Sequence, residues 1–148
     1  MPERPEQRKE LFFKPEYITP SRMAEYAFQF RKITERKPES VLEIGPGPGV
    51  LNYLLKQAGI QVSTLDCDPS LEPDILADVR EIEAKQTYDL IACFEILEHI
   101  PFDDLKSTLA NIAAAAHRDV LVTVPDAGKI YVLRTSLPLV GTRENAWR

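Results

Sequence analysis

The part of the sequence best suited to chemistry is a glycine-rich turn behind a short apolar stretch. Val41–Ile44 is typical of a buried strand, and it is followed by Gly45, Gly47 and Gly49, which alternate with two prolines. Glycines at such a turn allow close approach of a ligand to the backbone, because they carry no Cβ. A dinucleotide fingerprint requires its third glycine three positions after the second, where this chain has Val50.

The same turn is poorly suited to an anion. Pro46 and Pro48 have no N–H groups to donate, and Glu43 adds a negative charge just before the turn. A cation with amine donors would fit this place better than a pyrophosphate. A nucleotide-binding oxidoreductase is therefore the less favoured class, and a rigid structural turn is the alternative interpretation of the Gly-Pro pairs.

Acidic residues occur at or near the carboxyl ends of several predicted strands: Glu43, Asp66, Asp78 and Glu95. Ligands of open α/β sheets bind at this edge, and Asp66 follows the turn by about twenty residues, where an acid can accept hydrogen bonds from a ribose diol. S-adenosylmethionine presents an ammonium, a sulfonium, a ribose diol and an adenine amine, all of which suit carboxylates. A surface ion pair with Arg80 is the alternative for Asp78, and a solvated loop is the alternative for Glu95.

Five segments resemble the successive motifs of class I S-adenosylmethionine-dependent methyltransferases. They are VLEIGPGPG, STLDCD, ILADV, YDLIACFEILEHIP and VLVTVP, between residues 41 and 125. The FEILEHIP segment is similar to the small-molecule branch that includes ubiquinone-biosynthesis enzymes. The resemblance implies methyl transfer from S-adenosylmethionine to a small-molecule acceptor. The alternative is an S-adenosylmethionine-binding module without turnover, such as a shortened methyltransferase or a subunit.

The resemblance implies contacts with the methionine and ribose parts of this cofactor. Glu43, Gly45 and Gly47 would face the methionine part, and Gly49 would let the next helix pack closely. Asp66 would bind the ribose hydroxyls.

The resemblance also implies contacts further along the sheet edge. Cys67 would lie beside the adenine, Asp78 would accept a hydrogen bond from its amino group, and the Val79 N–H would meet a ring nitrogen. Phe94 and Glu95 would border the cofactor and the path of the acceptor.

A proton acceptor is needed only if the methyl acceptor is an O–H or N–H group, because alignment of the reacting atoms supplies much of the catalysis. His99, in the loop after the fourth strand, is the first candidate for this base and Glu95 is the second. The alternative is that His99 packs or caps the loop before Pro101. The two cysteines, Cys67 and Cys93, are too few for a zinc site or a disulfide framework, so no metal is expected.

The order of elements predicts an α/β fold with a Rossmann-like, mostly parallel sheet and helices on both faces. Residues 1–18 are interpreted as an N-terminal arm, mobile to residue 16, residues 19–125 as the S-adenosylmethionine-binding domain, and residues 126–148 as a tail of uncertain structure. No clear final β-hairpin is expected, although the family usually has one after the fifth strand. The predicted strands are Val41–Ile44, Gln61–Leu65, Asp74–Ala77, Tyr88–Phe94 and Val120–Val124.

Composition limits the partners. A net charge of −5 disfavours nucleic acid, and no apolar stretch is long enough to span a bilayer. The cysteine usage suggests a reducing cytoplasm. An open edge at Val120–Val124, with apolar stretches at Ile130–Leu133 and Leu137–Val140 behind it, suggests a homodimer through this edge or through the tail.

Overall fold

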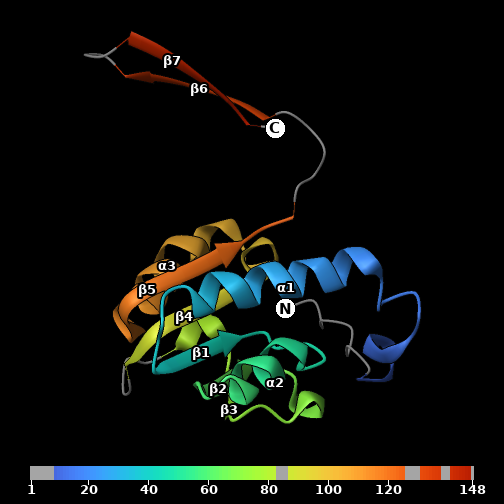
Figure 1. Cartoon of the computed structure of the whole chain (residues 1–148). Helices are drawn as coiled ribbons and strands as arrows, with labels where there is room; N and C mark the ends of the chain where they lie inside the picture. Colours follow the sequence, from blue (N-terminus) through green and yellow to red (C-terminus); the bar gives the residue numbers. More distant parts are fainter. Residues whose placement is uncertain (1–8, 83–86, 126–130, 138–140, 148) are drawn as a thin grey trace.

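The computed structural model describes residues 9–82, 87–125, 131–137 and 141–147, and its centre is a five-stranded parallel sheet (Figure 1). The strand order is β3-β2-β1-β4-β5. The parallel α/β fold expected from the sequence is therefore confirmed. The bounds of the strands are β1 Ser40–Ile44, β2 Gln61–Asp66, β3 Ile75–Leu76, β4 Tyr88–Phe94 and β5 Ala116–Thr123.

The strand order reverses at β1, which pairs with β2 on one side and with β4 on the other. Ile44 is in register with Leu65 of β2 and with Cys93 of β4, so the three carboxyl ends lie at the same edge. Ligands of open α/β sheets bind at the carboxyl ends beside such a reversal. The turn that follows β1 therefore lies where a ligand is expected.

Helices cover both faces of the sheet. The helices α1 (Pro20–Thr34) and α2 (Val50–Gln57) cover one face, and α3 (Phe102–Ala115) covers the other. The 3-10 helices are η1 (Lys9–Phe13), η2 (Pro69–Leu71), η3 (Val79–Glu81) and η4 (Leu97–His99). As the sequence predicts, α1 starts with Pro20 behind an N-cap, where Thr19 Oγ1 accepts a hydrogen bond from the Arg22 N–H at 3.2 Å.

Along β1 and β4, successive side chains point to opposite faces of the sheet and so belong to two separate layers of the core. Val41 and Leu90 pack against Ile33 of α1 and Leu51 of α2, whereas Leu42 packs towards α3. Four consecutive residues of β1 are buried, as is normal for a parallel strand covered on both faces. The strand is therefore held rigidly, and so is the start of the turn behind it.

The tail differs from the expectation that no clear hairpin is present. The strands β6 (Tyr131–Leu137) and β7 (Gly141–Trp147) pair antiparallel, with Leu137 in register with Gly141. Gly141, which interrupts the apolar pattern of the sequence, is the first residue of β7, and Pro138 lies outside the described residues. Most of the apolar stretch 137–140 falls outside the described residues.

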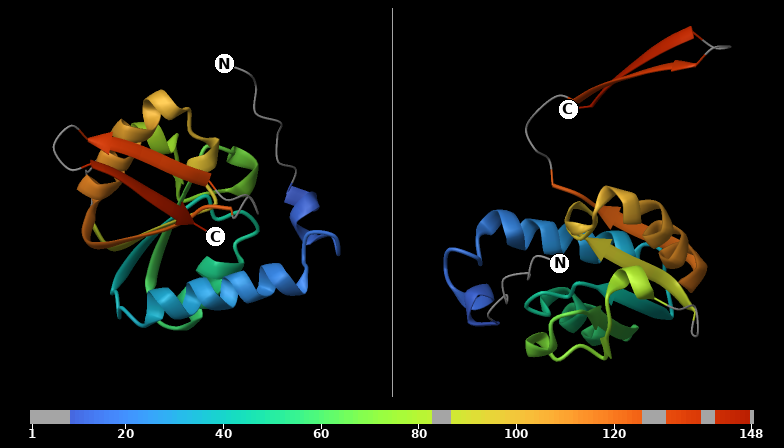
Figure 2. Two further views of the ribbon diagram at one scale, coloured as in Figure 1. Left: turned by 90° about the horizontal axis from the view of Figure 1, so that it is seen from above. Right: turned by 180° about the vertical axis from the view of Figure 1, so that it is seen from behind.

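This hairpin forms a two-stranded sheet of its own. Figure 1 and the right-hand view of Figure 2 show it apart from the five-stranded sheet. Among the described residues, β5 is paired with β4 alone, which leaves its outer edge open. No helix in the described part of the chain is long and apolar enough to cross a membrane.

The N-terminal segment also differs from the expectation of a mobile arm. Residues 9–13 form η1, and Phe12 is buried. Its ring meets the ring of Tyr17 edge-on, with centroids 5.0 Å apart. The segment is thus packed onto the domain before α1 begins.

Candidate functional site

The turn between β1 and α2 has the close backbone packing that its glycines predict. Gly45, Gly47 and Gly49 all have positive φ, between 52° and 78°, a region that other residues rarely adopt. The N–H of Gly45 donates to Leu65 O at 2.8 Å, which ties the turn to β2. A Cβ at Gly45 would overlap the side chain of Ile96, so the loop after β4 lies directly against the turn.

Glu43 lies beneath this turn and is buried, with 5% of its surface exposed. The side chain and backbone N–H of Asn52 in α2 donate hydrogen bonds to its carboxylate. Its second oxygen, Oε2, is buried without a hydrogen-bond partner among the described residues. Burial raises the pKa of Glu43 to about 8, although Asn52 and the charge of Lys56 act in the opposite direction. A buried carboxylate oxygen of this kind is suited to a cationic donor.

Asp66 ends β2, beside the turn, as the sequence predicts. Its Oδ1 accepts a hydrogen bond from the Asp68 N–H at 2.9 Å, and Asp68 in turn caps η2. The carboxylate is therefore held in a fixed direction at the carboxyl edge. Cys67 follows it and is exposed, and it forms no disulfide within the described part of the chain.

Asp78 is engaged in an ion pair, which was the alternative interpretation of this residue. Its Oδ2 lies 2.7 Å from Nη2 of Arg80, and its Oδ1 accepts from the backbone N–H and Nε of the same residue. Arg80 also bonds Asp104 of α3 at 3.1 Å. Asp78 is the N-cap of η3, and Val79 behind it is buried. The structure thus gives Asp78 a role in joining η3 to α3.

Glu95 follows β4 in a left-handed conformation, with φ of 55°. Its N–H donates to Thr123 O at 3.0 Å, and Thr123 Oγ1 donates to Glu95 Oε1 at 2.8 Å. A positive φ is uncommon outside glycine, asparagine and aspartate, and such residues are concentrated at functional sites. Phe94, just before it, packs partly against the core beside α1 and α2.

His99 ends η4, four residues beyond Glu95, and its side chain is 57% exposed. Its Nε2 lies 3.9 Å from the carboxylate of Glu98. The side chain lies at the surface and not in the core, so it is accessible to a ligand at this edge.

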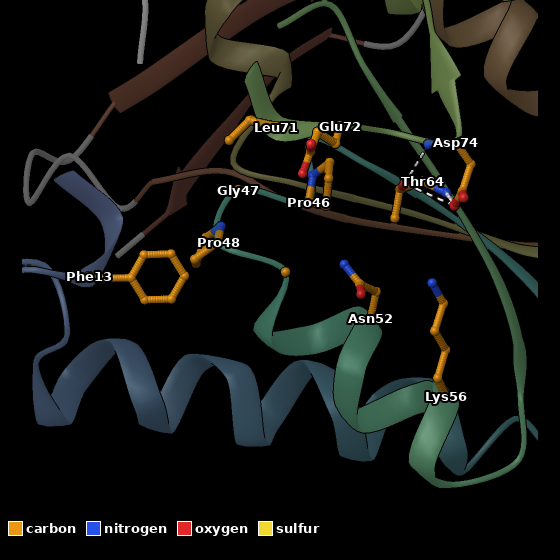
Figure 3. A pocket seen from close by; sticks show the side chains of 11 residues that line it. Phe13, Pro46, Gly47, Pro48, Asn52, Lys56, Thr64, Leu71, Glu72 and Asp74 are labelled. Carbon is orange, nitrogen blue, oxygen red and sulfur yellow. Dashed lines mark hydrogen bonds between the residues drawn. The ribbon is translucent and has the colours of Figure 1, made fainter. Parts of the chain in front are cut away.

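A cavity of about 220 Å³ opens beside the glycine turn (Figure 3). Phe13 of η1 stands next to Pro48 at one end, and Lys56 of α2 lies at the other. The wall at β2 is fixed by Thr64, whose hydroxyl and N–H both donate to Asp74 Oδ2 at 3.0 and 2.9 Å. The lining residues are Phe13, Pro46, Gly47, Pro48, Gly49, Asn52, Lys56, Thr64, Leu71, Glu72 and Asp74.

Several residues beside the expected site could not be predicted from the sequence. Asn52, Ile96 and Thr123 contact the expected site residues only in the folded chain. Phe13 belongs to a segment that carries no motif. In the described part of the chain, no group of His, Cys, Asp and Glu side chains could hold a metal ion.

An open parallel sheet with a glycine turn at its order reversal, and acids on the neighbouring strand ends, defines a ligand-binding α/β domain. The comparisons with known proteins make the class specific. The methyltransferase domain family matches residues 17–139. The chain belongs to this family.

The relatives show how much of the chain is shared. A ubiquinone biosynthesis O-methyltransferase from Pseudomonas aeruginosa is 30% identical over 96 residues, covering 54% of this chain. This chain spans only 39% of that relative's length.

Two solved structures share the fold at low identity. The sugar N-methyltransferase KedS8 from Streptoalloteichus has a TM-score of 0.68 at 13% identity, covering 98% of this chain and 78% of its own. The N-methyltransferase NodS from Bradyrhizobium japonicum, in complex with S-adenosyl-L-homocysteine, has a TM-score of 0.63 at 14% identity. That match covers 75% of this chain and 67% of NodS.

Proposed function

We propose that this chain binds S-adenosylmethionine at the glycine turn and transfers its methyl group to a small-molecule acceptor. The observation that carries the proposal is the buried Glu43, whose oxygen Oε2 has no hydrogen-bond partner among the described residues. Such an orphaned acceptor beneath a glycine turn fits the cofactor's ammonium. Membership of the methyltransferase domain family and the relatives named above support the same assignment.

The cofactor would be held along the carboxyl edge of the sheet. Glu43 would accept from the ammonium, with Gly45 and Gly47 beside the methionine part and Gly49 allowing α2 to pack close. Asp66 would accept from the ribose hydroxyls. In support of this placement, Glu43 lies in β1, Asp66 ends the neighbouring β2, and the three glycines lie in the turn after β1.

The adenine end is proposed to lie further along the same edge. Cys67 and the Val79 N–H would contact the ring, and Phe94 would border the cofactor. Asp78 can reach the adenine amino group with only part of its carboxylate, because Arg80 bonds both of its oxygens.

The chain's own contribution to chemistry is to orient the reactants and to take a proton. The bound cofactor supplies an electrophilic methyl group on its sulfonium, and transfer of this methyl group leaves S-adenosylhomocysteine. An O–H or N–H acceptor must lose a proton as the new bond forms. We propose His99, exposed at this edge, as the base that takes it, with Glu95 as the second candidate, held in place by Thr123.

The acceptor is proposed to be a small molecule because the relatives named above act in ubiquinone biosynthesis and on a sugar. Cys67 and Cys93 form no disulfide within the described residues, which agrees with the cytoplasm as the proposed compartment. A binding module without turnover is the alternative.

The test of activity is a reaction of the purified chain with cell extract and S-adenosylmethionine carrying a labelled methyl group. We expect label in a small-molecule product and an equal amount of S-adenosylhomocysteine. Cofactor binding without labelled product or S-adenosylhomocysteine would favour the binding module. Absence of cofactor binding would overturn the proposal as a whole.

A further inference from the structure

The N-terminal segment Lys9–Tyr17 contains an abrupt contrast in burial. Phe12 is 6% exposed, whereas its neighbours Leu11 and Phe13 are 47% and 60% exposed. A large aromatic side chain becomes buried only where other atoms cover it, and η1 is too short to cover its own residues. Phe12 must therefore be covered by the rest of the domain.

Part of what covers Phe12 is the glycine turn. A Cβ built at Gly47 would lie 4.0 Å from Cε1 of Phe12 and 3.8 Å from the hydroxyl of Tyr17. The two rings meet edge-on with centroids 5.0 Å apart. The aromatic pair therefore packs on the glycine that is proposed to face the methionine part of the cofactor.

Tyr17 holds this pair in place through three further contacts. The Arg22 guanidinium lies 4.1 Å from the centre of the Tyr17 ring. Burial, and after it the neighbouring Tyr17 side chain, raise the pKa of Tyr26 in α1, which places the two tyrosine side chains next to each other. The N–H groups of Tyr17 and Ile18 donate to Lys14 O at 2.9 and 3.0 Å, which fixes the bend between η1 and α1.

The segment also contributes to the cavity. Phe13, the next residue in η1, lines it together with the glycine turn (Figure 3). The methyltransferase domain family matches residues 17–139, so residues 9–16 lie outside the matched range.

We propose that Lys9–Tyr17 forms a wall of the methyl-donor site, in which Phe12 is a positioning residue that packs against Gly47 and retains the bound donor. This inference rests on the proposed function, because it assumes that the donor lies at the glycine turn. Closing this side excludes water from the donor and slows its release. The exposed Leu11, one residue away, has no such contact and provides a matched control.

The experiment measures the affinity and dissociation rate of S-adenosylhomocysteine for the full chain and for Phe12→Ala, Phe12→Leu and Leu11→Ala. We expect Phe12→Ala to raise the dissociation rate at least tenfold. Phe12→Leu should recover most of the loss, and Leu11→Ala should stay within twofold of the original chain. An unchanged dissociation rate in Phe12→Ala would overturn the inference. So would a loss of affinity that Phe12→Leu fails to recover.

A second measurement needs no variant. Hydrogen exchange of the original chain should show slower exchange at residues 11–18 when S-adenosylhomocysteine is bound, by about tenfold or more. Equal exchange with and without ligand, in a chain that binds the ligand, would contradict the proposed wall and leave the proposed function intact. A chain that does not bind S-adenosylhomocysteine at all would instead overturn the proposed function.

Discussion

At the scale of single residues, Glu43 is the clearest mark of a binding site. A buried carboxylate costs free energy unless its oxygens are paired, and one of them has no partner within the described residues. Asn52 lowers the pKa of this group, but burial outweighs it. The domain therefore keeps an acid beneath the glycine turn at a cost to stability, which is typical of functional sites.

Glu43→Gln should make stability less dependent on pH. Burial raises the pKa of Glu43 from 4.5 to about 8. Between pH 4.5 and pH 8, the folded chain therefore keeps a proton that the unfolded chain has released. The free energy of unfolding should therefore fall as pH rises from 4.5 to 8, by at most about 1.4 kcal/mol per pH unit from this group. Urea unfolding at a series of pH values measures it.

The exposed Glu39→Gln is the control for this comparison. The difference in stability between the original chain and Glu43→Gln should change across this pH range, and the difference for Glu39→Gln should not. A constant difference for Glu43→Gln would show that its carboxylate does not titrate as its burial requires.

His99→Ala should separate catalysis from binding. Because His99 is largely exposed, its removal should leave the fold and the affinity for S-adenosylmethionine nearly unchanged. If it is the base, turnover of an O–H or N–H acceptor should fall by roughly 10²-fold or more. A lower melting temperature with normal turnover would instead give His99 a structural role in the loop before Pro101.

At the scale of elements, the strand ends were the most predictable part of the site. Parallel strands bring their carboxyl ends to one edge, so the apolar runs of β1, β2 and β4 suffice to place Glu43 and Asp66 together. The partners of these residues could not be predicted in this way, because Asn52 and Ile96 reach the site from α2 and from the loop after β4.

The errors at this scale have physical causes. The first half of β5, Ala116–Asp119, was missed because an edge strand can carry polar residues such as His117 and Arg118. The hairpin β6–β7 was missed because Gly141, where β7 begins, looks like a break in an apolar run. The burial of Phe12 was missed because neither periodicity nor a motif predicts its contact with Gly47.

Gly45→Ala should destabilise the turn between β1 and α2. The substituted residue would have to adopt a φ of 69°, and its methyl group would overlap Ile96. A left-handed conformation alone costs about 1–2 kcal/mol. Gly59→Ala is the matched control, because it has φ of 81° and open space around its Cβ position. Urea unfolding should show a larger loss for Gly45→Ala, and equal losses would contradict the close packing against Ile96.

At the scale of the whole molecule, the outer edge of β5 is the feature that could pair with another chain. Val120 and Val122 of β5 and Val124 just after it are exposed, and β5 is paired on one side only within the described residues. The hairpin β6–β7 forms a separate two-stranded sheet, which is marginally stable in water by itself. The sequence already suggested a homodimer through this edge or through the tail, and the open edge supports it.

We therefore expect a homodimer in solution, measured by light scattering at high micromolar concentration. Val122→Lys should shift the mass towards the monomer, because a charge on an exposed edge opposes strand pairing. Leu76→Lys, an exposed position in β3 at the other end of the sheet, should leave the mass unchanged. A monomer at this concentration would contradict the expectation.

The central claim, that the carboxyl edge of this sheet binds S-adenosylmethionine through Glu43 and Asp66, is tested most directly by calorimetric titration. S-adenosylhomocysteine should bind the original chain, and NAD should not bind. Asp66→Ala should bind at least tenfold more weakly without unfolding, because a hydrogen bond to a charged group contributes about 1.5–3 kcal/mol. Tight binding of NAD with no response to S-adenosylhomocysteine, or an unchanged affinity in Asp66→Ala, would contradict the account.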